Sequence, residues 1–157
     1  MSTNIFVYGV LQYDELVQQL TGNTFQKVSA ELLNHQRLTL HMEGWSDLGV
    51  VIPSPDSLVQ GTILLEVDDA ALAVLDDFEE ADTGLYMRKL AIIRLENGQE
   101  AQVSVYAGTQ KAREHLDGEW DEQAFVSKHY ATYKDEIIPK FLKERALRLA
   151  EQSDAEE

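Results

Sequence analysis

The segment 86–108 constrains the fold most, because it holds two strand patterns joined at Asn97-Gly98. An Asn-Gly pair between two runs rich in apolar and β-branched residues is the strongest short-range signal of a β-hairpin. Other strand patterns precede this segment, whereas helical patterns are few and the longest lies at the C-terminal end. Because hairpin-like strands dominate, the sequence predicts an α+β fold rather than a doubly wound one, with a small closed or strongly curved sheet.

Hydrophobic periodicity and turn residues predict the remaining elements. We expect strands over 4–9, 24–33, 36–42 and 58–67, and helices over 68–80 and 121–152. A short helix should start at Asp14, as a possible N-cap, and stop at Gly22. The segment 43–57, with two glycines and two prolines, is expected to be a loop, and 153–157 a frayed tail. Pro139 should break or restart the last helix, because proline has no N–H to donate.

Composition restricts the class of protein. The chain has 157 residues, 44% hydrophobic and 26% charged, which suits one globular domain. Its net charge of −15 disfavours binding to nucleic-acid phosphates and to anionic membranes. The absence of cysteine excludes disulfides and a cysteine nucleophile, and the four histidines lack the spacing of metal ligands. Because no basic leader or membrane-length apolar run occurs, we expect a cytoplasmic protein.

A helical wheel separates four carboxylates near the end of the predicted helix 68–80. At about 100° per residue, the apolar side chains of 71–78 occupy one arc, and Glu79 falls inside that arc. The other three acids, Asp76, Asp77 and Glu80, fall outside it. The pattern therefore predicts that Glu79 points towards the interior and that the other three face solvent.

The interior position changes the expected acidity of Glu79. Burial, the negative end of the helix dipole and the like charge of Asp76 all raise the pKa of this carboxyl group. A raised pKa brings the group towards the range in which a general acid or base works near neutral pH. The alternative is a structural ion pair between Glu79 and Arg88 or Lys89, and the pattern leaves both interpretations about equally open.

The end of the first strand is a second candidate region. Gly9 follows Tyr8 there, and glycine lets the backbone approach a ligand closely. Successive amide N–H groups in such a turn can form an anion or oxyanion site, although an ordinary turn is the commoner outcome. Tyr86 and Arg88 lie two apart on a predicted strand and share a face, which an amphipathic strand with a solvent-facing arginine also explains.

Five short motifs follow one another within residues 4–108. They are "FVYGVL", "LVQGTILLEV", "LDDFE", "LYMRK" and "VSVYAG". In this order they resemble the γ-glutamylcyclotransferase-like family, especially its small bacterial and γ-glutamylamine-type members. The resemblance implies a small mixed β-barrel flanked by helices, with one pocket. We expect such a domain over 1–120, with 121–157 as a helical C-terminal extension packed on it.

The resemblance also implies roles for matching residues. The glutamate that ends the family's Leu-Asp-x-Phe-Glu motif is the catalytic acid/base, and it matches Glu79. The turn of Tyr8, Gly9, Val10 and Leu11 would bind a γ-glutamyl group mainly through its backbone, and Tyr86 and Tyr106 would line the same pocket. The implied reaction is attack of the α-amine on the δ-carbonyl carbon, which closes 5-oxoproline and expels an amine or amino acid without metal or cofactor.

Two departures from the family pattern leave a second hypothesis open. Val10 stands where the family commonly has Thr or Ser, and Gln12 stands where it commonly has a basic residue. The chain could therefore be a non-catalytic small-molecule-binding or interaction module that keeps the fold. For partners we expect a small γ-glutamyl molecule and neither nucleic acid nor membrane, and a homodimer stays open. The sequence does not choose among glutathione, a γ-glutamyl dipeptide and a γ-glutamyl polyamine.

Overall fold

The structure is a computed structural model that describes residues 2–43, 48–80 and 84–156. Its strands are β1 (Ser2–Val7), β2 (Lys27–Leu40), β3 (Leu48–Asp68), β4 (Tyr86–Leu95), β5 (Glu100–Gly108) and β6 (Leu116–Glu119). Its helices are α1 (Asp14–Thr21), α2 (Asp69–Glu80), α3 (Gln110–Arg113), α4 (Glu122–Lys128), α5 (Tyr130–Thr132) and α6 (Ile138–Glu156). A 3₁₀ turn, η1 (Val10–Gln12), follows β1, and a π-helical turn, η2 (Tyr133–Ile137), precedes α6.

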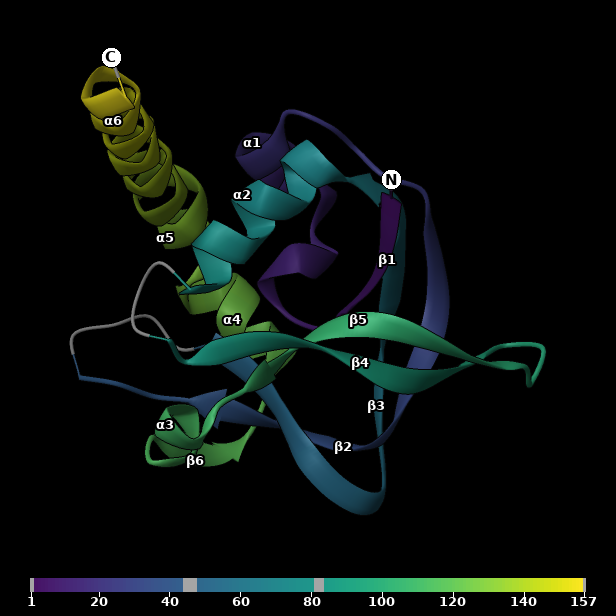
Figure 1. Ribbon diagram of the computed structural model, residues 1–157. Helices are drawn as coiled ribbons and strands as arrows, with labels where there is room; N and C mark the ends of the chain where they lie inside the picture. Colours follow the sequence, from purple (N-terminus) through teal and green to yellow (C-terminus); the bar gives the residue numbers. More distant parts are fainter. Residues whose placement is uncertain (1, 44–47, 81–83, 157) are drawn as a thin grey trace.

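The six strands form one sheet in the order β3-β1-β5-β4-β2-β6 (Figure 1). An additional pairing of β2 with β3 joins two strands that are far apart in this order, so the sheet curves round and closes on itself. The β1–β5 pair is parallel and the other pairs are antiparallel. The predicted α+β class with a strongly curved sheet flanked by helices is confirmed.

The loop expected over 43–57 is wrong for the described part from Leu48 onward, which belongs to β3. Residues 48–53 pair with β2, and the ladder resumes at Leu58 after the register shift opposite Asn34. The intervening residues form a bulge, where the N–H of Asp56 donates to Oδ1 of Asn34 at 3.1 Å. A bulge tolerates Pro55, which has no N–H for a ladder. The same shift divides β2, so the two strands predicted over 24–33 and 36–42 form one irregular strand.

Several helix ends and turns lie at the residues that predict them. Helix α1 ends at Thr21 and is followed by its C-cap Gly22, whose φ of 79° is the left-handed conformation that glycine adopts without strain. Its N-cap is Tyr13 and not Asp14, so that detail of the prediction is wrong. The predicted hairpin is confirmed: Gly98, with a φ of 87°, donates its N–H to the carbonyl oxygen of Leu95. Strand β1 ends at Val7, which leaves Tyr8 and Gly9 in the connection after it.

The C-terminal helices differ from the prediction at their end. Helix α4 begins at Glu122 after its N-cap Asp121, whose side chain accepts the N–H of Ala124, and α6 begins at Ile138 after η2. Pro139 is the second residue of α6 and comes directly after η2, so the helical hydrogen-bond pattern changes beside the proline where the sequence predicts a break or restart. Helix α6 continues to Glu156, so the predicted frayed tail is wrong over 153–156, while residue 157 lies outside the described residues.

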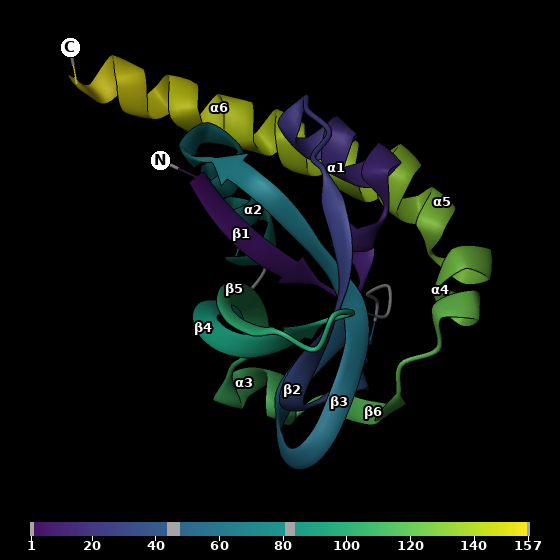
Figure 2. The same cartoon turned by 90° about the vertical axis from the view of Figure 1, so that its right-hand side faces the viewer.

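Two clusters of buried side chains hold the fold together. One fills the inside of the curved sheet, with Phe6, Leu32, Ile93 and Val105 among its members. The other lies between the sheet and the helices, and its members include Leu16, Leu75, Phe125 and Ile138. Figure 2 shows α6 crossing over α1 and α2 on the helical side of the molecule.

The division of the chain at residue 120 stays a prediction. Within the described parts of the chain, no helix is both long enough and apolar enough to cross a membrane.

Candidate functional site

A cavity of about 50 Å³ opens where the end of β1, the end of α2 and strands β3, β4 and β5 meet. The seven residues proposed for the site from the sequence all line it: Tyr8, Gly9, Val10, Leu11, Glu79, Tyr86 and Tyr106. The rest of the described lining is mostly apolar and consists of Phe6, Val7, Leu48, Gly49, Phe78, Leu85 and Tyr133. The structure therefore brings the predicted residues together, while their functional roles stay predictions.

Helix α2 carries Glu79 to the cavity. Its first turn is capped by Asp68, whose Oδ1 accepts the N–H of Ala71 at 2.8 Å. Ala71 and Leu75 are buried against the sheet, which fixes the rotation of the helix. One helical turn beyond Leu75, the chain presents Glu79, half-buried, to the cavity. The apolar face of the helix thus places a carboxylate among largely apolar walls.

The turn that follows β1 forms one wall of the cavity. Tyr8, Val10 and Leu11 are buried, and η1 follows Gly9 directly. The turn closes through the N–H of Gln12, which donates to the carbonyl oxygen of Gly9 at 3.0 Å. Because the first amides of a helical turn have no partner within that turn, the N–H groups of residues 9–11 are not needed to hold it.

Three tyrosines that line the cavity have hydroxyl groups bonded to protein acceptors. Tyr8 donates to the carbonyl oxygen of Tyr106, and Tyr86 donates to that of Gly49 at 2.7 Å. Tyr106 donates to Oδ1 of Asp76 at 2.7 Å. Burial raises the pKa of each of the three phenols well above its usual value, and the charge of Glu79 adds to the effect. All three hydroxyls therefore keep their protons near neutral pH.

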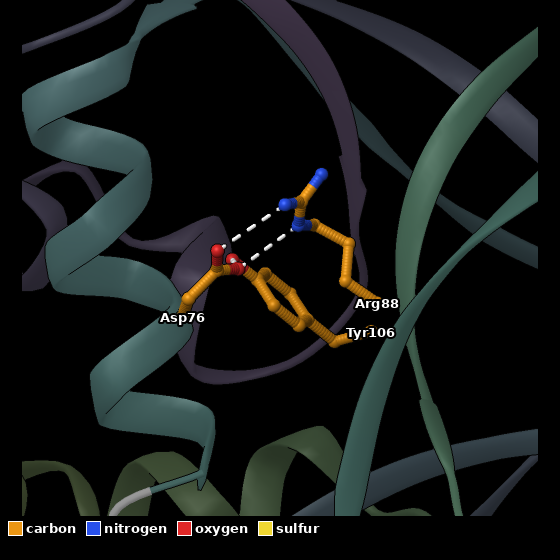
Figure 3. A network of polar contacts seen from close by, with 3 residues as sticks. All are labelled: Asp76, Arg88 and Tyr106. Carbon is orange, nitrogen blue, oxygen red and sulfur yellow. Dashed lines mark hydrogen bonds and ion pairs between the residues drawn. The ribbon is translucent and has the colours of Figure 1, made fainter.

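Asp76 is the residue that the sequence reading missed. It was expected to face solvent, but it forms a two-bonded ion pair with Arg88, with Nε–Oδ1 at 2.9 Å and Nη2–Oδ2 at 3.3 Å. Figure 3 shows Asp76 on its helix facing Arg88 and Tyr106. Arg88 and Tyr106 are directly opposite each other on β4 and β5, so one carboxylate reaches both.

Asp77 and Glu80 are the other two acids predicted to face solvent. Asp77 faces solvent as predicted, with 40% of its side chain exposed, and it also pairs with Nε of Arg145 on α6 at 2.7 Å. The side chain of Glu80 lies outside the described residues. The predicted alternative, an ion pair of Glu79 with Arg88 or Lys89, stays a prediction, while the described bonds of the Arg88 guanidinium go to Asp76. Pairing across β4 and β5 was the missing signal, because register cannot be read from a helical wheel.

The described lining of the cavity was compared with the ligand sets that metal ions need. In the described residues, no group of three or more His, Cys, Asp or Glu side chains is arranged to hold a metal ion. The residues with polar side chains in its described lining are Glu79 and four tyrosines, and the turn after β1 contributes its backbone. Such a set can transfer a proton and stabilise a developing negative charge.

Known proteins share both the sequence pattern and the fold. A family model described as gamma-glutamyl cyclotransferase, AIG2-like, matches residues 5–122. AIG2-like protein C of Arabidopsis thaliana is 32% identical over 119 residues, which are 75% of this chain and 66% of that protein. This chain thus spans just under two thirds of that relative. AIG2-like protein D of the same plant is 28% identical, over 80% of each chain.

Solved structures agree with these matches. A solution structure of an Arabidopsis thaliana protein has a TM-score of 0.66 at 28% identity and covers 93% of this chain and 92% of its own. A gamma-glutamyl cyclotransferase structure has a TM-score of 0.62 over 75% of this chain and 70% of its own, and its 18% identity shows the fold alone. The resemblance drawn from the five motifs is confirmed. The chain belongs to the gamma-glutamyl cyclotransferase, AIG2-like family.

Proposed function

We propose that this protein is a γ-glutamylcyclotransferase-type enzyme that releases 5-oxoproline from a small γ-glutamyl amine or γ-glutamyl amino acid. The observation that carries the proposal is the presence of Glu79 and the Tyr8–Leu11 turn on the walls of one cavity. One supplies a proton-transfer group, and the other supplies backbone N–H groups for a developing oxyanion. The family membership supports the same reaction class.

The proposed reaction is intramolecular. The α-ammonium group of the substrate gives a proton to the carboxylate of Glu79, because an α-amine is largely protonated at neutral pH. The free amine then attacks the δ-carbonyl carbon, and a C–N bond forms that closes a five-membered ring. As the bond to the leaving nitrogen breaks, Glu79 returns the proton to that nitrogen. The carboxylate then takes the second proton that the ring nitrogen must lose and passes it to the departing amine, which leaves as an ammonium ion. The attacking and attacked groups are already tethered, so holding them in a near-attack pose supplies much of the acceleration.

The apolar walls of the cavity assist this chemistry. Val10, Leu11, Phe78 and Leu85 surround the polar groups and limit access of water. In a site with little water, each electrostatic interaction with the developing charge is stronger than it would be in bulk solvent. The same walls favour the small, compact ring-closing end of a substrate.

A second candidate function is a binding module that keeps the cavity without turnover. Val10 favours it, because this buried lining residue has no hydroxyl where the family commonly has one. If the turn works through its main chain, the substitution leaves turnover intact.

Product analysis separates the two candidates. The protein is incubated with a panel of γ-glutamyl amino acids, γ-glutamylamines and glutathione, and 5-oxoproline is measured by mass spectrometry. The proposal predicts product from at least one member of the panel and loss of product in Glu79→Gln. Binding of a panel member without product, or product that is unaffected by Glu79→Gln, would favour the binding module.

A further inference from the structure

The polar side chains of the cavity share one hydrogen-bonding character. A tyrosine hydroxyl has a single proton to donate and lone pairs to accept with. The protons of Tyr8, Tyr86 and Tyr106 are committed to a carbonyl oxygen, a second carbonyl oxygen and a carboxylate. These three hydroxyls can therefore offer a ligand only their lone pairs. The carboxylate of Glu79, when ionised, is likewise an acceptor.

The rest of the described lining contributes no side-chain cation. Apart from Tyr133, this part of the lining is apolar and contains no Lys, Arg, His, Asn, Gln, Ser, Thr or Trp. A wall of acceptors in a partly water-excluded space is complementary to a group that carries only donors. A primary ammonium group has three donors, no acceptor and a positive charge, so it matches this wall.

Asp76 sets the hydrogen-bonding direction at Tyr106. Its carboxylate receives two N–H groups from Arg88, one on each oxygen, and an ionised carboxylate can only accept. The third contact, at 2.7 Å, must therefore be donated by the Tyr106 hydroxyl (Figure 3). Without that contact, the Tyr106 hydroxyl could rotate and donate its proton to a ligand. The tyrosine hydroxyls would then no longer all act as acceptors towards the ligand.

Tyr106 also connects this contact to the first strand. Its backbone carbonyl oxygen accepts the hydroxyl of Tyr8, while its own hydroxyl binds Asp76. Tyr106 thus accepts a hydrogen bond from Tyr8 in the turn after β1 and donates one to Asp76 on α2. The same helix carries Glu79. A change at Asp76 is expected to act on the ligand through Tyr106 rather than by direct contact, since Asp76 is not among the lining residues.

We propose that Asp76, paired with Arg88, is a positioning residue that commits the Tyr106 hydroxyl as a donor and so keeps the tyrosine wall as an acceptor site for a primary ammonium group. The ligand's identity as a γ-glutamyl compound rests on the proposed function. The hydrogen-bonding character of the wall does not.

Binding of a matched ligand pair tests the proposal. γ-N-methyl-L-glutamine and N-methylglutaramate differ only in the α-ammonium group, and Glu79→Gln serves as the parent so that turnover does not interfere. Calorimetry should show that the parent prefers the ammonium ligand by about ten-fold or more, the scale of a hydrogen bond to a charged group. Adding Asp76→Asn or Tyr106→Phe should bring this ratio close to one.

A matched control separates recognition from stability. Tyr130 also donates its hydroxyl to a carboxylate, that of Glu15 at 2.7 Å, but it does not line the cavity. Tyr130→Phe in the same parent should leave the ratio unchanged. A merely structural role of Asp76 would weaken both ligands equally, and far-ultraviolet circular dichroism reports whether each variant is folded.

The outcomes are distinct from those of the proposed function. Equal affinity of the parent for both ligands, no measurable binding of either, or a ratio retained in Asp76→Asn and in Tyr106→Phe overturns the inference. Failure of the unsubstituted protein to form 5-oxoproline overturns the proposed reaction alone. An ammonium preference that disappears in Asp76→Asn supports the inference whether or not turnover is found.

Discussion

The hydroxyl of Tyr8 donates a hydrogen bond to the backbone carbonyl oxygen of Tyr106, 98 residues away in the chain. Tyr8 follows β1 and Tyr106 lies on β5, the strand that runs parallel beside it. Both side chains line the cavity. The bond therefore fixes the turn after the first strand against the strand that faces α2.

Removing this hydroxyl should lower stability. Tyr8→Phe keeps the ring but leaves the buried carbonyl oxygen of Tyr106 without the donor, which costs about 1–3 kcal/mol of unfolding free energy. Tyr130→Phe is the control, because its hydroxyl bonds an exposed carboxylate and should cost less than about 1 kcal/mol. Urea unfolding measures both. Equal losses in the two variants would contradict the burial of the Tyr8 contact.

The buried tyrosines also predict how stability depends on pH. Burial raises the pKa of Tyr86 in the folded state, whereas in the unfolded chain it ionises near its usual value of 10.0. Its contribution to stability is therefore complete below that value and is lost as the pH rises above it. For such a group the loss approaches about 1.4 kcal/mol per pH unit.

Urea unfolding from about pH 9 to about pH 11 measures this loss. Tyr86→Phe should make the fall above pH 10 shallower than in the unsubstituted protein, because one phenol no longer ionises on unfolding. Parallel curves for the two proteins would mean that Tyr86 ionises equally well in the folded state.

A glycine inside the curved sheet tests the close approach of its strands. A Cβ at Gly61 would lie 2.5 Å from Cζ of Phe6 and 2.6 Å from the backbone oxygen of Val7. The backbone cannot yield locally, so Gly61→Ala should cost about 1–3 kcal/mol or more. Gly98→Ala meets no atom within 4 Å, and its φ of 87° should cost about 1–2 kcal/mol. A Gly61→Ala protein as stable as the original would contradict the packing of β1 on β3.

The turn after β1 is proposed to act through its main chain. Val10→Thr introduces the hydroxyl that the family commonly has without changing the shape of the side chain. The rate of 5-oxoproline formation should change by no more than about three-fold, because the backbone donors are unaffected. An increase of about a hundred-fold would show instead that a hydroxyl supplies part of the catalysis.

The features that the sequence predicted correctly are those set by residues close to one another in the chain. Gly22 and the Asn97-Gly98 turn act through a few neighbouring residues, and both were predicted. The position of Glu79 follows from the period of one helix, which the sequence displays directly. Asp76 lies on the same helix, but its partners come from β4 and β5, whose register no local pattern reveals.

The loop prediction for residues 48–57 was wrong for a related reason. Its prolines and glycine favour a loop, but pairing with β2 overrides that preference over 48–53, and a bulge opposite Asn34 takes up 54–57. Strand propensity is decided by neighbours as much as by the residues themselves. At the C-terminal end, the polar composition of residues 153–156 predicted fraying, but these residues continue α6.

The carboxylate of Glu79 is proposed to transfer protons in the cavity, and the rate of 5-oxoproline formation by Glu79→Gln is the measurement that decides this role. Asp77→Asn is the matched control, since it removes a carboxylate from the same helix that pairs with Arg145 and does not line the cavity. We predict a fall of about a hundred-fold or more in Glu79→Gln and a change within about three-fold in Asp77→Asn. A folded Glu79→Gln protein that keeps its rate, or an equal fall in both variants, would contradict the claim.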